Sequence, residues 1–525
     1  MNQPTNAPSP IEDSLQFFAS DLFHDVQMSR LFKDSKTFAD ACPKMAWAEI
    51  YTDYDASHQQ GDFNLALFVE EHFAVPMDIN LSNDGPAFSV TDCIESLWPK
   101  LERPADKPDC SSLVPLTHPY IVPGGRFREI YYWDSYFTAL GLQASGRIAL
   151  VKSMVSNFIE LQDKFGFIPN GNRSYYHTRS QPPILGLMVE LVMEHFPFDN
   201  ITARRDFLAY CVEGLEKEHQ FWMQGKEQLS AQSKAFRRVV QLPDGSVLNR
   251  YWDDSATPRP ESYREDIEAS AHLGVAQRKD FYRNIRAACE SGWDFSSRWL
   301  AQANNLHSIQ TTRLVPIDLN CLLYKLEILL GKFHGELEKN SASDHYKTCA
   351  VARHRAIDHY LWSEEKGIYY DYLIDQNQQS DVVSLAAVIP LFVNIASQSQ
   401  ANKVKQVIIE RFLVKGGLTT TRYNSEQQWD APNGWAPLHW FAVMGLQHYQ
   451  FCDVAITIMQ RWLATVEQYF AGHKHLMEKY NVMELNSVAP GGEYIVQQGF
   501  GWTNGVSLAF YHLLKEMDPK GEKGA

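Results

Sequence analysis

Apolar residues recur at helical spacing in the stretch from residue 146 to residue 164. Their positions are three or four residues apart, at Ile148, Val151, Val155, Phe158 and Leu161. This spacing predicts an amphipathic helix, and Gly166 stands where a helix commonly stops. The later stretch 184–196 is apolar nearly all round, which predicts a helix that is buried on most sides.

Further segments of the chain show the same periodicity. They are residues 319–330, 383–396, 453–470 and 504–515. Asp318 precedes the first of them and is a candidate N-cap. Alternation of apolar and polar residues, the pattern of half-buried strands, is scarce. The periodicity therefore predicts an all-α fold.

The loops between these helices are rich in Gly, Pro, Trp and acidic residues. A Trp-Asp pair recurs in them at 133–134, 252–253, 293–294 and 429–430. A ring of paired helices would gather such loops at one end and build a concave site from them. We therefore expect a closed toroid of helix pairs. The alternative is an elongated helical solenoid, although solenoid repeats are more regular than these segments.

The composition supports a folded protein and limits its partners. The chain has 525 residues, of which 45% are hydrophobic and 13% aromatic, enough apolar surface to build a core. Its net charge of −15 argues against a nucleic acid or an anionic membrane as partner. No stretch approaches the roughly 18 consecutive apolar residues that indicate a membrane span.

The N-terminus and the cysteines bear on the compartment. Residues 1–18 are polar and contain prolines, with neither a basic nor an apolar signal region. The 8 cysteines are scattered, without a CxxC pair or a His cluster, so neither a disulfide framework nor a zinc site is indicated. We expect reduced thiols, no metal and a cytoplasmic location.

Residues 123–136, PGGRFREIYYWDSY, carry the densest set of candidate binding groups. Arg126 presents a planar fork of donors, Trp133 offers a flat face for a sugar ring, and Asp134 can accept from hydroxyl groups. Residues 428–437, QWDAPNGWAP, combine aromatic faces with amide and carboxylate groups in the same way. Any one of these residues could belong to a structural Arg–Asp pair, but the whole set favours a polyhydroxylated ligand.

Motifs for several other chemistries are absent. The sequence has no GxxxxGK[ST] or GxGxxG for a phosphate ligand, no GxSxG and no HExxH. If the ligand is a sugar, its hydrolysis needs one protonated and one ionised carboxyl. The candidates, all acids in unusual loop settings, are Asp134, Glu261, Asp294, Asp430, Glu478 and Glu493. Residue type alone does not choose among them.

Taken together, these segments resemble the trehalases, the inverting glycoside hydrolases of family 37. The pattern PGGRFxExYxWDxY is complete at 123–136, and QWDxPxGWxP is complete at 428–437. Shorter trehalase-like pieces lie at 168–173, 179–183, 259–263, 290–294, 493–494 and 499–504. The resemblance covers roughly residues 40–515.

The resemblance implies an (α/α)6 barrel that hydrolyses α,α-trehalose to two glucose molecules, with inversion at one anomeric carbon and without a cofactor. By position, Asp294 matches the general acid of the family and Glu478 its general base. Asp134 is expected to bind the substrate. Residues that match other substrate-binding positions are Arg126, Trp133, Asn170, Arg179, Arg259, Glu261, Trp435 and Glu493.

The organisation expected from this resemblance is one barrel with additions at both ends. A flexible tail (1–14) and an N-terminal extension (15–112) that packs on the barrel precede the catalytic barrel (113–515), and a second tail follows (516–525). We expect a monomer with trehalose as its small-molecule partner. The sequence departs from the family at 483–490, MELNSVAP, where members often carry a glycine run, so loop closure over the substrate can differ.

Two rival functions stay open. One is an inverting (α/α)6 hydrolase of another α-glucoside or of a glycerate-linked sugar. The other is a sugar-binding protein without catalysis, which would have lost one carboxyl, whereas Asp294 and Glu478 are both present.

The arginines give a prediction about charge. Because guanidinium groups lower the pKa of a nearby carboxyl, we expect Arg126, Arg179 and Arg259 beside Glu478. Asp294 is expected against an aromatic wall, which would keep it protonated.

Overall fold

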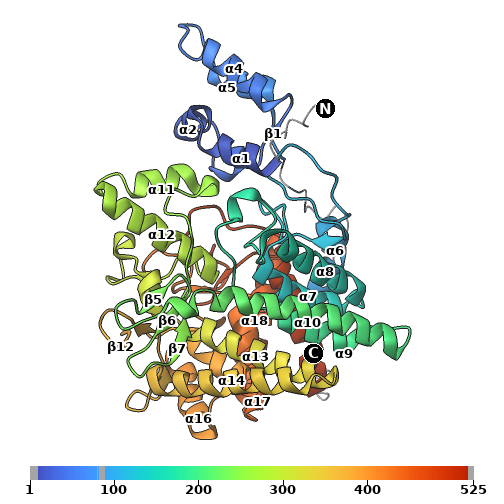
Figure 1. Ribbon diagram of the computed structural model, residues 1–525. Helices are drawn as coiled ribbons and strands as arrows, with labels where there is room; N and C mark the ends of the chain where they lie inside the picture. The colour runs from blue at the N-terminus through green and yellow to red at the C-terminus, as the bar shows by residue number, and fades with distance from the viewer. Residues whose placement is uncertain (1–9, 78, 80, 82–88, 518–525) are drawn as a thin grey trace.

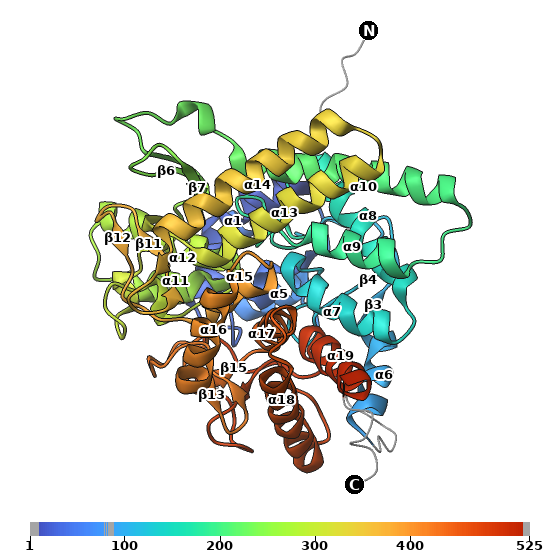
Figure 2. The same cartoon turned by 90° about the horizontal axis from the view of Figure 1, so that it is seen from below.

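A ring of helices surrounds the axis of the molecule in the computed structural model, which describes residues 10–77, 79, 81 and 89–517 (Figures 1 and 2). Each inner helix contacts the next one around the ring, and α19 contacts α7 and closes it. The inner helices are α7 (Tyr132–Ala144), α9 (Leu185–His195), α13 (Ile317–Glu336), α15 (Ile389–Phe392), α17 (Ala436–His448) and α19 (Gly501–Met517).

A second layer of helices lies outside this ring and alternates with the inner helices along the chain (Figure 2). The outer helices are α6 (Val90–Leu101), α8 (Ile148–Phe165), α10 (Ile201–Met223), α14 (Asn340–Tyr360), α16 (Gln398–Val407) and α18 (Cys452–His473). This is an (α/α)6 barrel, so the predicted fold class is confirmed. Helices α11 (Tyr263–Ala269) and α12 (Val275–Ser291) are inserted between α10 and α13.

The periodicity located most of these helices correctly. Helix α8 ends where expected, at Gly166, which adopts a φ of 81° and donates its N–H to the Gln162 carbonyl. Helix α9 is buried from Leu185 to Val189 and again at Val192 and Met193, in agreement with its apolar sequence, while its last two residues are exposed. Helices α18 and α19 include the predicted runs 453–470 and 504–515.

Two details of the helix prediction are wrong. Pro316, not Asp318, is the N-cap of α13, and Asp318 lies inside the first turn because its carboxylate pairs with Arg298. The run 383–396 is helical only at Leu385–Val388 (a 3-10 turn) and in α15, since Asn394 takes a positive φ of 57°.

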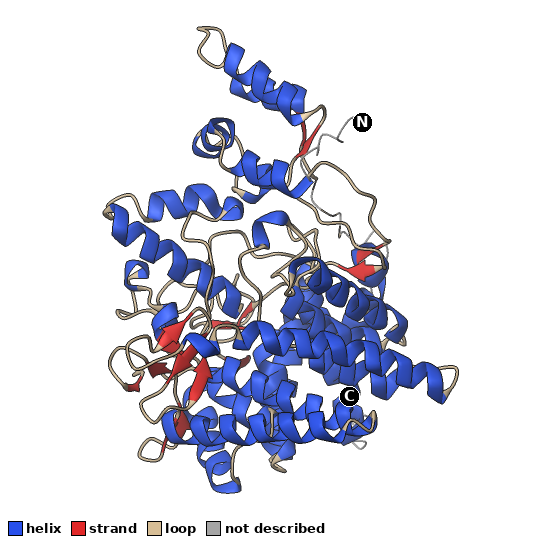
Figure 3. Ribbon diagram, in the orientation of Figure 1, coloured by secondary structure: helices blue, strands red, loops and turns tan. Residues whose placement is uncertain are grey.

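The described strands are short and form small antiparallel sheets (Figure 3). The sheets with three strands are β5 (Ala235–Phe236), β6 (Val239–Gln241) and β7 (Val247–Asn249), and β8 (Leu314–Val315), β11 (Tyr372–Leu373) and β12 (Gln378–Gln379). The pairs are β1 (Cys42–Pro43) with β2 (Phe73–Ala74), β3 (Glu102–Arg103) with β4 (Tyr120–Ile121), β9 (Trp362–Ser363) with β10 (Ile368–Tyr369), β13 (Leu413–Val414) with β14 (Gly417–Leu418), and β15 (Asn433–Gly434) with β16 (Tyr480–Asn481).

The N-terminal extension lies at one end of the barrel (Figure 1). Its helices are α1 (Pro10–Phe18), α2 (Asp21–Met28), α3 (Lys36–Ala39), α4 (Trp47–Ser57) and α5 (Leu65–His72). Residues 10–14 of the expected first tail are therefore helical, as are residues 516–517 of the second, because α1 and α19 include them. Residues 1–9 and 518–525 of the expected tails lie outside the described residues.

The buried apolar residues form two clusters. One runs from Val90 to Phe510 and is the barrel core. The other runs from Phe17 to Phe73 and includes Tyr131, Tyr175 and Tyr176 from the barrel loops. The core of the extension is thus completed by tyrosines of the barrel. No helix in the described part of the chain is both long and apolar enough to cross a membrane.

Candidate active site

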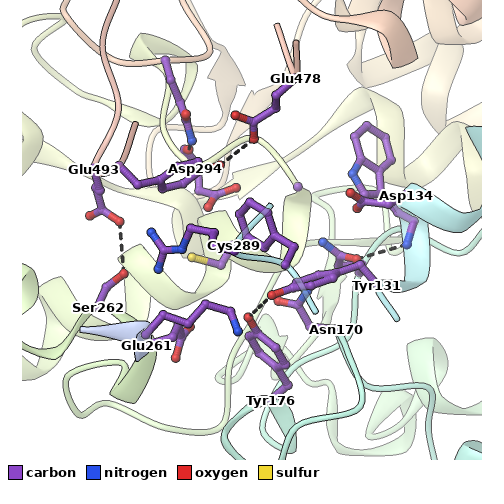
Figure 4. Close-up of a pocket in the computed structure, with 18 of the residues that line it drawn as sticks. Tyr131, Asp134, Asn170, Tyr176, Glu261, Ser262, Cys289, Asp294, Glu478 and Glu493 are labelled. Atoms are coloured by element: carbon purple, nitrogen blue, oxygen red, sulfur yellow. Dashed lines mark hydrogen bonds between the residues drawn. The ribbon is translucent and has the colours of Figure 1, made fainter. Parts of the chain in front are cut away.

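A pocket lies at the end of the barrel where the inner helices α7, α9, α17 and α19 begin. The loops that lead into these helices supply much of its wall (Figure 4). Every residue predicted for the site lines this one pocket. These residues are Arg126, Trp133, Asp134, Asn170, Arg179, Arg259, Glu261, Asp294, Trp435, Glu478 and Glu493.

The loop that carries Asp294 begins where α12 ends at Gly292. Gly292 takes a φ of 75°, and a Cβ at this position would lie 2.9 Å from the indole of Trp133, so the close packing requires glycine. Burial raises the pKa of Asp294 to about 7, with Glu493 adding to the effect and Arg259 and Arg179 opposing it. A carboxyl with this pKa is partly protonated near neutrality and can act as an acid.

Glu478 lies directly before β16 and is held by the chain around it. Its side chain accepts a hydrogen bond of 2.7 Å from the Tyr494 hydroxyl and one of 3.4 Å from the Gln497 backbone N–H. Burial raises its pKa, while Lys479, both hydrogen bonds and Arg126 act to lower it. The contacts with Glu478 therefore favour its ionised form.

Gln428 connects the segments of these two carboxyl residues. Its Nε2 donates to the backbone carbonyl of Asp294, and its Oε1 accepts a hydrogen bond of 2.9 Å from Lys479 Nζ. Lys479 also donates to the Gly491 carbonyl at 3.0 Å. One side chain of the second sequence motif thus fixes the loops of Asp294 and Glu478 relative to each other.

The arginines do not all lie where the sequence prediction placed them. Arg179 and Arg259 lower the pKa of Asp294, and only Arg126 of the three acts on Glu478. The prediction that all three serve Glu478 is therefore wrong. Their positions follow from other partners: Arg179 pairs with Glu261 at 2.7 Å, and Arg259 pairs with Asp266 at 2.6 Å and Glu493 at 2.9 Å.

Asp134 has no such cationic partner among its main electrostatic neighbours. Burial raises its pKa well above the usual value, and the charges of Glu478 and Asp294 add to this. The surroundings of Asp134 thus favour its neutral form.

Aromatic side chains line one side of the pocket. Trp429 and Trp435 stack in parallel with their ring centroids 4.0 Å apart. The ring centroid of Trp133 lies 6.3 Å from that of Trp429. These indoles are nearly fully buried, so they form a rigid wall. Flat apolar walls beside polar groups are what a sugar ring needs.

Two other Trp-Asp carboxylates lie outside the pocket lining. Asp430 accepts hydrogen bonds from Ser296, Ser297 and Thr421 at 2.6–3.0 Å. Asp253 pairs with Arg179 at 3.4 Å. Asp430 was an open candidate in the sequence, and its buried hydroxyl partners give it a structural role.

Sequence reasoning missed several lining residues. Gln181 lies within a quoted trehalase-like piece, RSQPP, and its Oε1 accepts from the Trp133 backbone N–H at 3.0 Å. Cys289 lies one turn before Gly292 on α12, and no sequence motif indicates that it lines the pocket. Lys36 comes from the extension, and nothing in its local sequence indicates the site.

Two polar atoms of the pocket are buried without a hydrogen-bond partner in the described part of the chain. They are Glu261 Oε2 and Arg126 Nε, one an acceptor and the other a donor. Buried polar groups are normally satisfied, so these atoms indicate a polar ligand. Among the described residues, no three His, Cys, Asp or Glu side chains gather as a metal site requires.

A sequence model of the trehalase family matches residues 30–515. The chain belongs to the trehalase family. A periplasmic trehalase of Escherichia coli (strain K12) is 44% identical over 494 residues, which cover 94% of this chain and 86% of that protein. The solved neutral trehalase of Saccharomyces cerevisiae is 28% identical with a TM-score of 0.63, over 76% of this chain and 74% of that one.

The same fold occurs in more distant proteins. A mannosylglycerate hydrolase of Thermus thermophilus matches 80% of this chain with a TM-score of 0.53, at 16% identity. At that identity the similarity shows the fold alone. Membership of the trehalase family, by contrast, establishes the reaction: the protein hydrolyses trehalose to glucose, and its partner is a small-molecule sugar.

The expected cytoplasmic location is wrong on this comparison. The relatives that match 94% of the chain at 44% identity carry the name periplasmic trehalase. The prediction rested on the polar residues 1–18 and on the scattered cysteines, and both are weaker evidence than similarity along nearly the whole chain.

Proposed function

We propose that Asp294 is the general acid and Glu478 the general base in the inverting hydrolysis of trehalose. The observation that carries this proposal is that two buried carboxyls in one pocket have different surroundings. Burial raises the pKa of both, to about 7 for Asp294, but Glu478 accepts hydrogen bonds that act to lower its pKa. Paired carboxyls with separated roles are the requirement of glycoside hydrolysis.

In the proposed reaction, protonated Asp294 donates its proton to the oxygen that bridges the two glucose units. Glu478, ionised, removes a proton from a water molecule that attacks the anomeric carbon from the opposite face. The C–O bond to the bridging oxygen breaks as the bond to water forms. One glucose leaves with its configuration unchanged and the other with its configuration inverted.

The remaining pocket residues would bind the sugar hydroxyls. Glu261 is fixed by Arg179, which also donates to Asn170 Oδ1 at 3.0 Å, so the free Glu261 Oε2 is a ready acceptor. Glu493 is held by Arg259 and by the Ser262 hydroxyl, which donates to it at 3.3 Å (Figure 4). These ion pairs would orient the carboxylates before the substrate arrives.

The aromatic and acidic residues of the motifs complete the binding site in this proposal. Trp133 and Trp435 would contact the C–H faces of the sugar, and Asp134 would hydrogen-bond its hydroxyls. Arg126, with its free Nε, would donate to the substrate close to Glu478.

For the organisation of the chain, we propose a barrel with an N-terminal extension whose own core spans Phe17–Phe73. The barrel core already includes Val90, so residues 90–112 are better grouped with the barrel than with the extension. The loop 483–490 borders the pocket residues Glu493 and Tyr494, and we propose that it closes over the substrate.

Substitution of the two carboxyls tests the assignment. Asp294→Asn and Glu478→Gln should each lower kcat by about 10²- to 10⁴-fold, because each removes a proton-transfer group without changing side-chain size much. Glu365→Gln is a matched control, since Glu365 is exposed and lies outside the pocket lining. The unfolding midpoint of every variant should show that it is folded. Full activity in either pocket variant would contradict the assignment.

A further inference from the structure

A segment of the N-terminal extension reaches the active-site pocket. Lys36, at the start of α3, is the residue of the segment 32–40 that lines the pocket. Lys36 is buried there, where its Nζ pairs with Glu129 at 2.8 Å and with Asp40 at 2.5 Å. The extension therefore contributes directly to the site.

This segment is held from the side of α11. The Ser35 hydroxyl donates to Glu265 at 2.5 Å, and the Arg264 guanidinium donates to the carbonyls of Phe32 and Lys33 at 3.3 and 3.0 Å. Helix α11 follows the turn Pro260–Ser262, which carries the pocket residue Glu261. The position of residue 34 is thus fixed relative to the pocket by contacts with the barrel.

Asp34 in this segment faces Arg126. Its Oδ2 lies 3.7 Å from Arg126 Nη1, and among the described residues it is the one carboxylate in ion-pair distance of Arg126. The guanidinium carbon of Arg126 lies 4.8 Å from the centroid of the Tyr494 ring, and Tyr494 in turn donates to Glu478. Arg126 is therefore held between the extension and the residue that binds the proposed base.

The electrostatics of the pair agree with this geometry. Burial alone would raise the pKa of Asp34, but the charge of Arg126 and hydrogen bonds from Thr37 lower it below the usual value. Burial would lower the pKa of Arg126, and the charge of Asp34 is the largest effect that raises it. Each group thus favours the charged form of the other.

We propose that Asp34 is a positioning residue for catalysis, which holds Arg126 beside Glu478. Asp34 is the one carboxylate within ion-pair distance of Arg126 among the described residues, so it is the group that orients the guanidinium. The inference rests on the proposed function, because Arg126 matters only if Glu478 and its surroundings act on the substrate. It assigns to the extension a role in the reaction beyond packing on the barrel.

Asp34→Asn is a suitable test because it removes the charge alone. The Thr37 backbone N–H and hydroxyl both donate to Asp34 Oδ1 at 2.9 Å, and an asparagine can accept the same hydrogen bonds at the start of α3. The variant should lower kcat/KM by about tenfold, and Asp34→Glu, which restores the charge, should recover most of the loss. Asp34→Ser, whose hydroxyl can also accept a hydrogen bond from Thr37, serves as the second variant if the first is poorly folded.

A double-mutant cycle distinguishes positioning from a merely structural role. In the background of Arg126→Gln, which has no positive charge, Asp34→Asn should change kcat/KM by less than about twofold, because the ion pair it removes is already lost. A loss that is equally large in both backgrounds would overturn the proposal.

Arg30→Gln provides the matched control within the same interface. Arg30 pairs with Glu268 at 2.6 Å, also between the extension and α11, but both side chains are exposed and neither lines the pocket. This variant should retain kcat/KM within about twofold.

Wild-type activity in Asp34→Asn would also overturn the proposal. If Asp294→Asn and Glu478→Gln slow the enzyme while Asp34→Asn does not, this inference alone fails. If the carboxyl variants are fully active, the proposed function fails first.

Discussion

The hydroxyl of Tyr494 donates a hydrogen bond of 2.7 Å to Glu478 Oε1. Its neighbour in sequence, Glu493, pairs with Arg259, which acts on Asp294. Two consecutive side chains of one loop therefore reach the surroundings of both proposed catalytic carboxyls. This loop therefore influences the pKa values of both Asp294 and Glu478.

Tyr494→Phe tests the contribution of this hydrogen bond. The bond lowers the pKa of Glu478, so its loss should raise that pKa and move the acidic limb of the kcat/KM profile to higher pH. The ring that lies against Arg126 is kept. Tyr511→Phe is the control, because Tyr511 donates to Glu467 at 2.6 Å outside the pocket. An acidic limb that is unchanged in Tyr494→Phe would contradict the assignment of that limb to Glu478.

The pH dependence of kcat/KM should be bell-shaped with an alkaline limb near pH 7. Asp294 must be protonated, so activity is lost as pH rises through its pKa of about 7. Activity is also lost as pH falls and Glu478 gains a proton. Because the pKa of Glu478 is raised, this acidic limb should lie above the usual glutamate range. Initial rates at low trehalose concentration between pH 4 and 9 measure both limbs.

Glu493→Gln should move the alkaline limb to lower pH. The negative charge of Glu493 raises the pKa of Asp294, and its removal also leaves Arg259 free to lower that pKa further. The acidic limb should move less, because Glu493 is not among the main influences on Glu478. A shift of the alkaline limb to higher pH would contradict the role given to Asp294.

Gly292→Ala should impair both stability and activity. The new Cβ would lie 2.9 Å from the Trp133 indole, and the residue would have to keep a φ of 75°. We expect a cost of about 1–3 kcal/mol from overpacking, together with a fall in kcat/KM as Trp133 and the Asp294 loop move.

Gly166→Ala separates these two effects. Gly166 has a similar φ of 81°, but a Cβ there would have no atom within 4 Å. This variant should lose roughly 1 kcal/mol of stability through backbone strain, with unchanged kcat/KM. Equal activity losses in both glycine variants would show that the Trp133 contact is not what matters.

The sequence predicted the barrel and the pocket lining well for physical reasons. Helical periodicity can be recognised within a single segment such as 146–164, without knowledge of the rest of the chain. The loop motifs at 123–136 and 428–437 likewise carry their binding groups close together in sequence. A closed ring then brings those loops to one end. Asp294 and Glu478 were chosen through the family resemblance, because residue type alone left six acids open.

Other features could not be predicted because they depend on tertiary contacts. Asp430 and Asp294 both follow a tryptophan, yet buried hydroxyls surround the first and the pocket surrounds the second. The positions of Arg179 and Arg259 depend on their ion pairs with Glu261 and Asp266, and no motif predicts these pairs. Asp34 lies 92 positions before Arg126, and only the folded chain brings them together.

The most direct test of the proposed mechanism is time-resolved NMR of trehalose cleavage, which reports the configuration of each glucose as it is released. An inverting reaction gives α-glucose and β-glucose in equal amounts as first products, because water inverts one anomeric carbon and the other unit leaves unchanged. Release of α-glucose alone at early times would show retention and contradict the roles assigned to Asp294 and Glu478.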